Sequence, residues 1–212
     1  MKKLIAMLLA LVLVLGLCAC GAGTEKTPET TQPTQAATEP SEVIDDTEPV
    51  ETTAPVVPNE ATDNLSVIWD AYAGEEFFTM GGDMNSMVDG APGNYDLADE
   101  GLTTILHVPE DQIPNLICAS SLMHGMLANN FTCGMYLVSE DADVKAFADA
   151  MKASIDSTQW VCGMPEKVLI AVVDTQFVMV AFGLNDTITA LETATTTVHP
   201  GVEILYSEAI TG

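Results

Sequence analysis

Residues 168–182 read VLIAVVDTQFVMVAF, and this run predicts a β-hairpin. Two segments rich in β-branched residues, 168–173 and 177–182, flank the short polar stretch 174–176. Val, Ile and Phe favour strands, and a short polar break fits a tight turn between antiparallel strands. We therefore expect two neighbouring strands joined at 174–176.

The segment before this hairpin predicts a strand and then a helix. Residues 131–138 alternate, with Phe131, Cys133, Met135 and Leu137 on one side and Thr132, Gly134, Tyr136 and Val138 on the other. From about 139 to 157, apolar side chains recur at helical spacing. These positions are Val144, Phe147, Met151 and Ile155. Acidic residues open the segment at 140–143, where carboxylates favour the positive end of the helix dipole.

Weaker patterns complete the expected fold. They predict helices over 64–73, over 97–106 and from Asn185 or Asp186 onward, strands over 117–127 and 202–206, and a long loop over 80–96. Asp63 or Asn64 is expected to cap the first helix, and Pro109 to open a further helical turn. The resulting order, (β)βαββα(β), predicts an α+β domain: an antiparallel sheet with helices packed on one face.

The first twenty residues, MKKLIAMLLALVLVLGLCAC, predict an export signal that ends in a lipidation site. Two lysines precede an apolar run that is too short to span a bilayer and suits a secretory signal. Residues 17–20 resemble the bacterial lipobox, which implies diacylglyceryl transfer to Cys20 and cleavage after Ala19. Two acyl chains would anchor the protein at the extracytoplasmic face of the bacterial cell membrane. The alternatives are an ordinary signal cleaved elsewhere and an uncleaved anchor.

This pattern divides the chain into three parts. Residues 1–19 are the expected lipoprotein signal peptide, residues 20–62 the lipidated cysteine and a disordered tether, and residues 63–212 a single globular domain. The tether is rich in Thr, Pro and Glu and has almost no aromatic content. Such a segment buries too little apolar surface to offset the entropy of ordering, so we interpret it as a spacer.

The charge of the chain limits its partners. There are 31 acidic residues and six lysines, no arginine, and a formal net charge of −25. Nucleic-acid binders and polybasic membrane-surface binders both depend on clustered Lys and Arg, so these classes are excluded. Basic peptides and cations are electrostatically favoured as ligands.

The block at 101–156 and the hairpin together carry a family resemblance. Motifs at 102–113, 123–126, 141–144 and 168–182 follow the order found in uncharacterised lipoproteins of clostridia-like, Gram-positive bacteria, which this chain resembles. Those proteins share a lipobox, an acidic Thr- and Pro-rich tether and a domain of unknown function. Here His107 replaces the usual glycine, and the domain cysteines are not part of the pattern. The resemblance implies a surface lipoprotein and supplies no catalytic residues.

Three cysteines and three histidines are the main candidates for chemistry in the domain. The spacing of Cys118, Cys133 and Cys162 matches no zinc or redox motif. Buried free thiols, one disulfide with one free thiol, and a reactive or metal-binding thiol all remain open. A nucleophilic pair of Cys118 with His124 or of Cys133 with His199 is a further alternative. The sequence has no phosphate-binding glycine loop, Rossmann fingerprint or serine-hydrolase motif.

Residues 83–90, DMNSMVDG, have the residue types of a cation site. Asp83, Asn85 and Asp89 offer hard oxygen ligands of the kind that calcium accepts. The EF-hand pattern is not met, because Met87 stands at a ligand position and no Glu closes the loop. Turn formation by Asp and Asn explains the same residues.

Methionines also gather in and around this stretch. The positions are Met80, Met84, Met87, Met123, Met126 and Met135. Core filling is the simpler explanation for them, and an adaptable apolar binding face is the alternative.

Together these features predict a membrane-anchored surface lipoprotein with a non-catalytic binding or accessory domain that uses no cofactor. The expected partners are the membrane, through lipidated Cys20, and a surface protein, a peptide or a small-molecule ligand. Two other functions stay open: a wall-associated hydrolase or thiol enzyme, and a calcium-dependent surface module.

Overall fold

The predicted hairpin forms two inner strands of a sheet. Strands β6 (Lys167–Asp174) and β7 (Phe177–Gly183) pair antiparallel, as do β7 and β5 (Phe131–Val138). The structure is a computed structural model that describes residues 59–211. The predictions for the signal peptide, Cys20 and the tether up to residue 58 lie outside the described residues.

The sheet has eight strands, and every pairing in it is antiparallel. The strand order is β2-β1-β4-β5-β7-β6-β8, and β3 pairs with β4 beside β1. The remaining strands are β1 (Thr79–Gly81), β2 (Val88–Asp89), β3 (Gly93–Tyr95), β4 (Leu116–His124) and β8 (Glu203–Ala209). The predicted α+β class with an antiparallel sheet is therefore confirmed.

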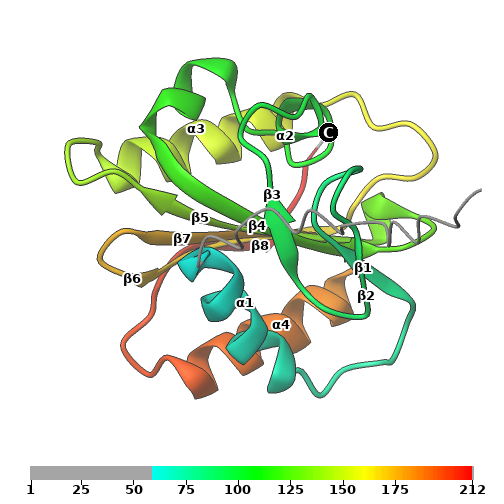
Figure 1. Cartoon of the computed structure of the whole chain (residues 1–212). Coiled ribbons are helices and arrows are strands. Elements are labelled where there is room, and N and C mark those ends of the chain that lie inside the picture. The colour runs from blue at the N-terminus through cyan, green and yellow to red at the C-terminus, as the bar shows by residue number, and fades with distance from the viewer. Residues whose placement is uncertain (1–58, 212) are drawn as a thin grey trace, which may run out of the picture. The chain divides into compact units, whose positions relative to one another are not determined.

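Helices cover both faces of the sheet, so their expected packing on one face alone is wrong. Figure 1 shows α3 (Val144–Ser157) and α2 (Gly101–Thr104) on one side, and α1 (Glu60–Asp70) and α4 (Asn185–Val198) on the other. Each side has its own apolar cluster. Phe147, Met151 and Ile155 of α3 lie in the first cluster. Leu65 of α1 and Leu191 of α4 lie in the second.

The connections between strands explain why the helices separate. The chain leaves β5, passes through α3 and returns at β6, with β7 in between; it then leaves β7, passes through α4 and returns at β8, with β6 in between. Both crossovers advance in the same direction across the sheet, but β5 and β7 run in opposite directions. Two crossovers of the same hand must then place their helices on opposite faces.

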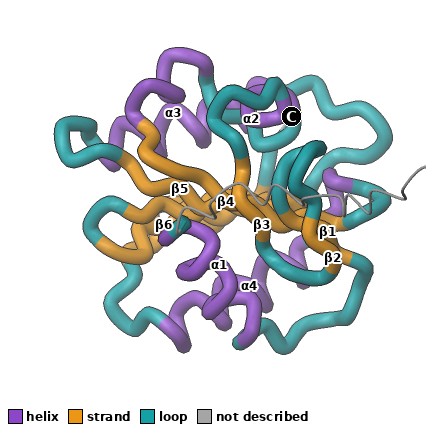
Figure 2. The backbone as a smooth tube through the Cα atoms, viewed as in Figure 1, coloured by secondary structure: helices purple, strands orange, loops and turns teal. Residues whose placement is uncertain are grey.

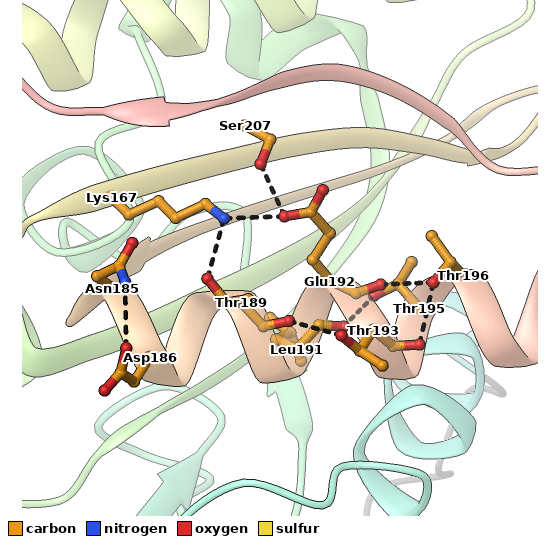
Figure 3. Close-up of polar contacts among 10 residues, drawn as sticks. All are labelled: Lys167, Asn185, Asp186, Thr189, Leu191, Glu192, Thr193, Thr195, Thr196 and Ser207. Atoms are coloured by element: carbon orange, nitrogen blue, oxygen red, sulfur yellow. Dashed lines mark hydrogen bonds and ion pairs between the residues drawn. The ribbon is translucent and has the colours of Figure 1, made fainter.

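Glu192 of α4 ties this helix to the sheet. Its carboxylate accepts hydrogen bonds from Lys167 Nζ of β6 at 2.9 Å and from Ser207 Oγ of β8 at 2.7 Å (Figure 3). The helix is rich in threonine, and several of its hydroxyls donate to the carbonyl four residues earlier. Such bonds satisfy the hydroxyls within the helix itself.

Several helix starts differ from the sequence prediction. Helix α1 begins at Glu60, and its cap is Asn59, whose side chain accepts from the backbone N–H groups of Ala61 and Thr62. Residues 59–62, which the sequence assigns to the tether, therefore belong to the folded domain. The cap of α4 is Leu184, instead of Asn185 or Asp186.

Two further boundaries shift in the same way. Asp143 caps α3, so the acidic residues before it precede the helix. Pro109 stands just before the 3₁₀ helix η1 (Glu110–Asn115) instead of inside it. A second 3₁₀ turn, η2 (Ala128–Asn130), joins β4 to β5.

The region 80–96, expected to be a loop, contributes three short strands at one end of the sheet (Figure 2). Glycines allow the backbones to approach there. A Cβ on Gly81 would lie 2.3 Å from the carbonyl oxygen of Ala91 and 2.4 Å from the nitrogen of Gly93. Glycine is the residue that permits this contact, because it has no side chain to displace.

Candidate functional site

A pocket lies where β1 and the loop that follows it meet the end of β4. Its volume is about 260 Å³. Four methionine side chains line it: Met80 from β1, Met84 and Met87 from the loop, and Met123 from β4. The rest of the lining is Gly81, Gly82, Asp83, Tyr95, Ile105, His124 and Gly125. We call this the methionine pocket.

The methionines of the domain divide into two groups. Met135, Met151 and Met179 are fully buried, as core filling predicts. Met84 and Met87, in contrast, are 69% and 52% exposed. Core filling is therefore wrong for these two and for Met126, which is 80% exposed and does not line the pocket. The alternative of an apolar binding face fits Met84 and Met87, which line the pocket.

Exposed apolar side chains also occur in segments at the end of the sheet where the pocket lies. They are Phe78, Val88, Met126, Leu127, Val161, Met164 and Leu184. Hydrogen bonds connect the segments that carry them: Asn129 donates to the carbonyls of Val161 and Gly163, and the N–H of Gly125 donates to the carbonyl of Phe78. Residues 125–139 and 157–165 contain no charged side chain, although the domain is strongly acidic. These two hydrogen-bonded segments therefore form an uncharged part of the domain.

Asp83 holds the pocket loop in place. It is only 5% exposed, and its carboxylate accepts four hydrogen bonds. One oxygen accepts from the backbone N–H groups of Asn85 and Ser86, and the other from Ser86 Oγ and the N–H of Asp96. Burial alone would raise the pKa of Asp83, but these bonds more than offset it, so the pKa lies below its usual value.

The predicted calcium site finds little support in this geometry. Asn85 and Asp89 are exposed, and Asp89 pairs with Met80 in the β1–β2 ladder. The carboxylate of Asp83 is already committed to the protein. Within residues 59–211, no three His, Cys, Asp or Glu side chains lie close enough to hold a metal ion. Calcium binding stays a prediction.

His124 ends β4 at the wall of the pocket. Its Nδ1 accepts hydrogen bonds from the N–H groups of Met126 at 3.1 Å and Leu127 at 3.2 Å. An Nδ1 that accepts leaves the proton of the neutral ring on Nε2. The ring also stacks on Phe77, with centroids 5.3 Å apart. His124 is therefore a fixed wall of the pocket with a donor at Nε2.

The cysteines in the described part of the chain are all free. Cys133 is buried, Cys118 half-buried and Cys162 exposed. In the β4–β5 ladder Cys118 pairs with Leu137, so Cys133 lies four residues away, about 13 Å along the strand. A disulfide needs Cα atoms less than about 7 Å apart, so these two thiols do not form one.

The two proposed Cys/His pairs are not supported either. Cys118 and His124 stand six residues apart on β4, which is about 20 Å in a strand. Burial alone raises the pKa of the Cys133 thiol well above its usual value, with no contribution from a neighbouring base. His199 lies at the C-terminal cap of α4. The structure thus supports neither the pair of Cys118 with His124 nor the pair of Cys133 with His199.

Comparisons of the chain with protein-family models, curated proteins and solved structures find no match. None of the helices in residues 59–211 has the length and apolar character needed to cross a bilayer. The functional argument therefore depends on the pocket itself.

Sequence reasoning identified the methionines but not their role. The signal that separates Met84 and Met87 from core residues is their setting, a run of Gly, Asp, Asn and Ser without apolar periodicity. Tyr95 and Ile105 could not be assigned to the pocket, because only the tertiary fold brings them there.

Proposed function

We propose that this protein is a surface lipoprotein whose domain binds a ligand in the methionine pocket without catalysing a reaction. The lipidated Cys20 holds the protein at the extracytoplasmic face of the membrane, and the tether presents the domain. The observation that carries the proposal is the placing of exposed methionines around an open, largely apolar pocket.

The size and lining of the pocket support this function. Ligand pockets for drug-sized molecules have volumes of roughly 300–1,000 Å³, so a pocket of about 260 Å³ suits a smaller ligand or one side chain of a peptide. Methionine is unbranched and polarizable, which lets it adapt to a ligand surface. The absence of a base beside Cys118 or Cys133 favours binding over thiol catalysis.

Methyl NMR of the full chain in lipid nanodiscs tests the binding site. The methionine methyl groups are labelled with ¹³C, and the panel contains short apolar peptides, basic peptides, small sugars, and soft and hard metal ions. We expect one ligand class to shift the methyl signals of Met80, Met84, Met87 and Met123 together. The buried methyl of Met135 is the internal control and should stay in place. A panel that leaves all four pocket signals unchanged would contradict the proposed site.

Anchoring has its own test in a bacterial host that processes lipoproteins. We expect Cys20→Ser to abolish incorporation of a labelled fatty acid and to release the protein from membranes, because sulfur is the nucleophile that takes the lipid. Cys18→Ser is the matched control and should leave labelling intact. Equal labelling of the wild type and the Cys20→Ser variant would remove the lipid anchor from the proposal.

A further inference from the structure

Two sulfur side chains of the methionine pocket are fixed next to each other by the sheet. Met80 of β1 and Met123 of β4 are direct partners in the antiparallel ladder. Side chains at such positions lie on the same face, with Cβ atoms about 4.5–5.5 Å apart. Both residues line the pocket, so two cross-strand neighbours that carry thioethers border the same space.

Two more methionines line the pocket from the loop that follows β1. Met84 and Met87 line the same pocket, and the loop that carries them is held by the hydrogen bonds of Asp83. Four thioether side chains from two separate chain segments, 80–87 and 123, thus line one space. A thioether is neutral at every pH and polarizable, and it prefers soft ions such as copper(I) over calcium or magnesium.

The charges at the pocket favour a cation over a neutral ligand. The carboxylate of Asp83 lines it, is nearly fully buried, and makes none of the ion pairs found in residues 59–211. No lysine lines the pocket. Its oxygens are occupied by four hydrogen bonds, so Asp83 would act on a bound ion as a nearby negative charge and not as a ligand.

His124 does not complete a metal site of the usual nitrogen type. Its Nδ1 accepts two backbone hydrogen bonds, and its Nε2 carries the proton of the neutral ring. The donor set is therefore made of sulfur alone, which further separates it from zinc sites, where Cys, His and carboxylate ligands dominate.

We infer that the methionine pocket binds a soft monovalent cation of the copper(I) and silver(I) class through its methionine sulfurs. This inference rests on the proposed function, because it names the ligand of the same pocket. Binding involves no redox step, since the ion enters and stays in its monovalent state.

Silver(I) is the probe for this inference, because it is stable in air. Silver nitrate is titrated in chloride-free buffer into the full chain in nanodiscs, with ¹³C-methyl-labelled methionine. Cys118 and Cys162 are replaced by serine so that accessible thiols of the domain do not compete for the ion. We expect the four pocket methyl signals to shift together and to saturate with a single ion per chain. The exposed methyl groups of Met126 and Met164 should not shift over that range. Sodium nitrate is the matched salt control.

A sulfur-deleted pocket provides the second arm. The variant with leucine at positions 80, 84, 87 and 123 keeps the size and apolar character of the side chains but removes the donors. We expect silver(I) affinity to fall at least about tenfold, since loss of even an outer-shell partner of a metal costs about 10–100-fold. The control variant, Met126→Leu with Met164→Leu, should keep the wild-type affinity. An unchanged Met135 methyl signal shows that a variant is folded. If the fourfold variant loses this signal, the double variant Met84→Leu with Met87→Leu, at the exposed loop positions, replaces it.

The outcomes separate this inference from the proposed function. Silver(I) affinity that survives in the leucine variant, or shifts confined to Met126 and Met164, would overturn the metal site. If silver(I) leaves the pocket signals unchanged while an apolar peptide shifts them, the ion inference is wrong and the pocket remains a binding site. If neither silver(I) nor any other member of the ligand panel shifts them, both proposals are wrong.

Discussion

Asp83 is the residue on which the wall of the methionine pocket depends. Its four accepted hydrogen bonds connect the start of the loop to Asn85 and Ser86 and to the backbone of Asp96. A buried carboxylate with this many donors stabilises the folded state through groups that are each costly to leave unpaired. The loop geometry that sets Met84 and Met87 at the pocket therefore depends on one side chain.

We expect Asp83→Asn to lower the free energy of unfolding by about 1–3 kcal/mol, measured in urea at neutral pH. The new amide retains one oxygen for Asn85 and Ser86, but its NH₂ group faces the N–H of Asp96, so two donors oppose each other. Asp89→Asn, on exposed strand β2, is the control and should stay within about 0.5 kcal/mol of wild type.

The difference in unfolding free energy between the wild type and Asp83→Asn should also depend on pH. The pKa of Asp83 is lower in the folded than in the unfolded chain, so its stabilisation is fully present above the unfolded value. It is lost as the pH falls through the lower, folded value. The stability difference between wild type and Asp83→Asn should therefore shrink under acid conditions, and a difference that grows with acidity would contradict this assignment.

At the scale of secondary-structure elements, Lys167 and Glu192 join three parts of the fold. Lys167 of β6 donates to Glu192 and to Thr189 of α4, and Ser207 of β8 donates to the same Glu192 carboxylate (Figure 3). Burial alone would raise the pKa of Glu192, but the bonds from Ser207 and Lys167 more than offset it and lower the pKa. One helix is thus attached to the last two strands of the sheet.

We expect Lys167→Met to lower the free energy of unfolding by about 1–3 kcal/mol, because the carboxylate of Glu192 loses its charged donor while it stays largely buried. Lys145→Met is the matched control. Lys145 pairs with Asp149 on the exposed surface of α3, where solvent screens the i,i+4 pair, so its loss should change the stability far less. Urea unfolding of both variants measures the difference. Equal losses would show that the position of the pair at the β6–α4 junction does not matter.

The sequence predicts a helix or strand well where the residues within that element determine its conformation. The strand at 131–138 matches β5 because its alternation is clear, and the hairpin at 168–182 has β-branched residues on both sides of a polar turn. The strands β1 and β3 were missed because they are short and glycine-rich, and they exist only where β4 offers an edge. Their formation depends on tertiary contacts that no local pattern contains.

The two-sided helix packing also had a signal in the sequence. Residues 168–173 are apolar at every position, and β6 has Val168 and Ile170 in one core cluster and Leu169 and Ala171 in the other. A strand that reads as a continuous apolar run is buried on both faces. The pattern therefore pointed to helices on both sides, and the crossover rule would have placed them there.

At the scale of the whole domain, charge and apolar surface are separated. Between residues 63 and 212 there are 22 acidic residues and three lysines, a net charge of −19. The charge-free segments 125–139 and 157–165 are joined by the hydrogen bonds of Asn129. The sequence contains each charge-free segment, but only the fold shows that they adjoin and that a buried carboxylate lies near them. For this reason the sequence predicts some residues of the pocket, but it does not predict that they lie together.

The ion pairs of the lysines have a consequence for how proteases act on the domain. All three lysines of the domain lie in helix α3 or strand β6, and each pairs with a carboxylate. Proteases that cut after Lys or Arg need an extended, accessible segment around a basic residue, and the chain has no arginine. The folded domain therefore offers such enzymes almost no substrate, and digestion by trypsin should leave it intact until it unfolds.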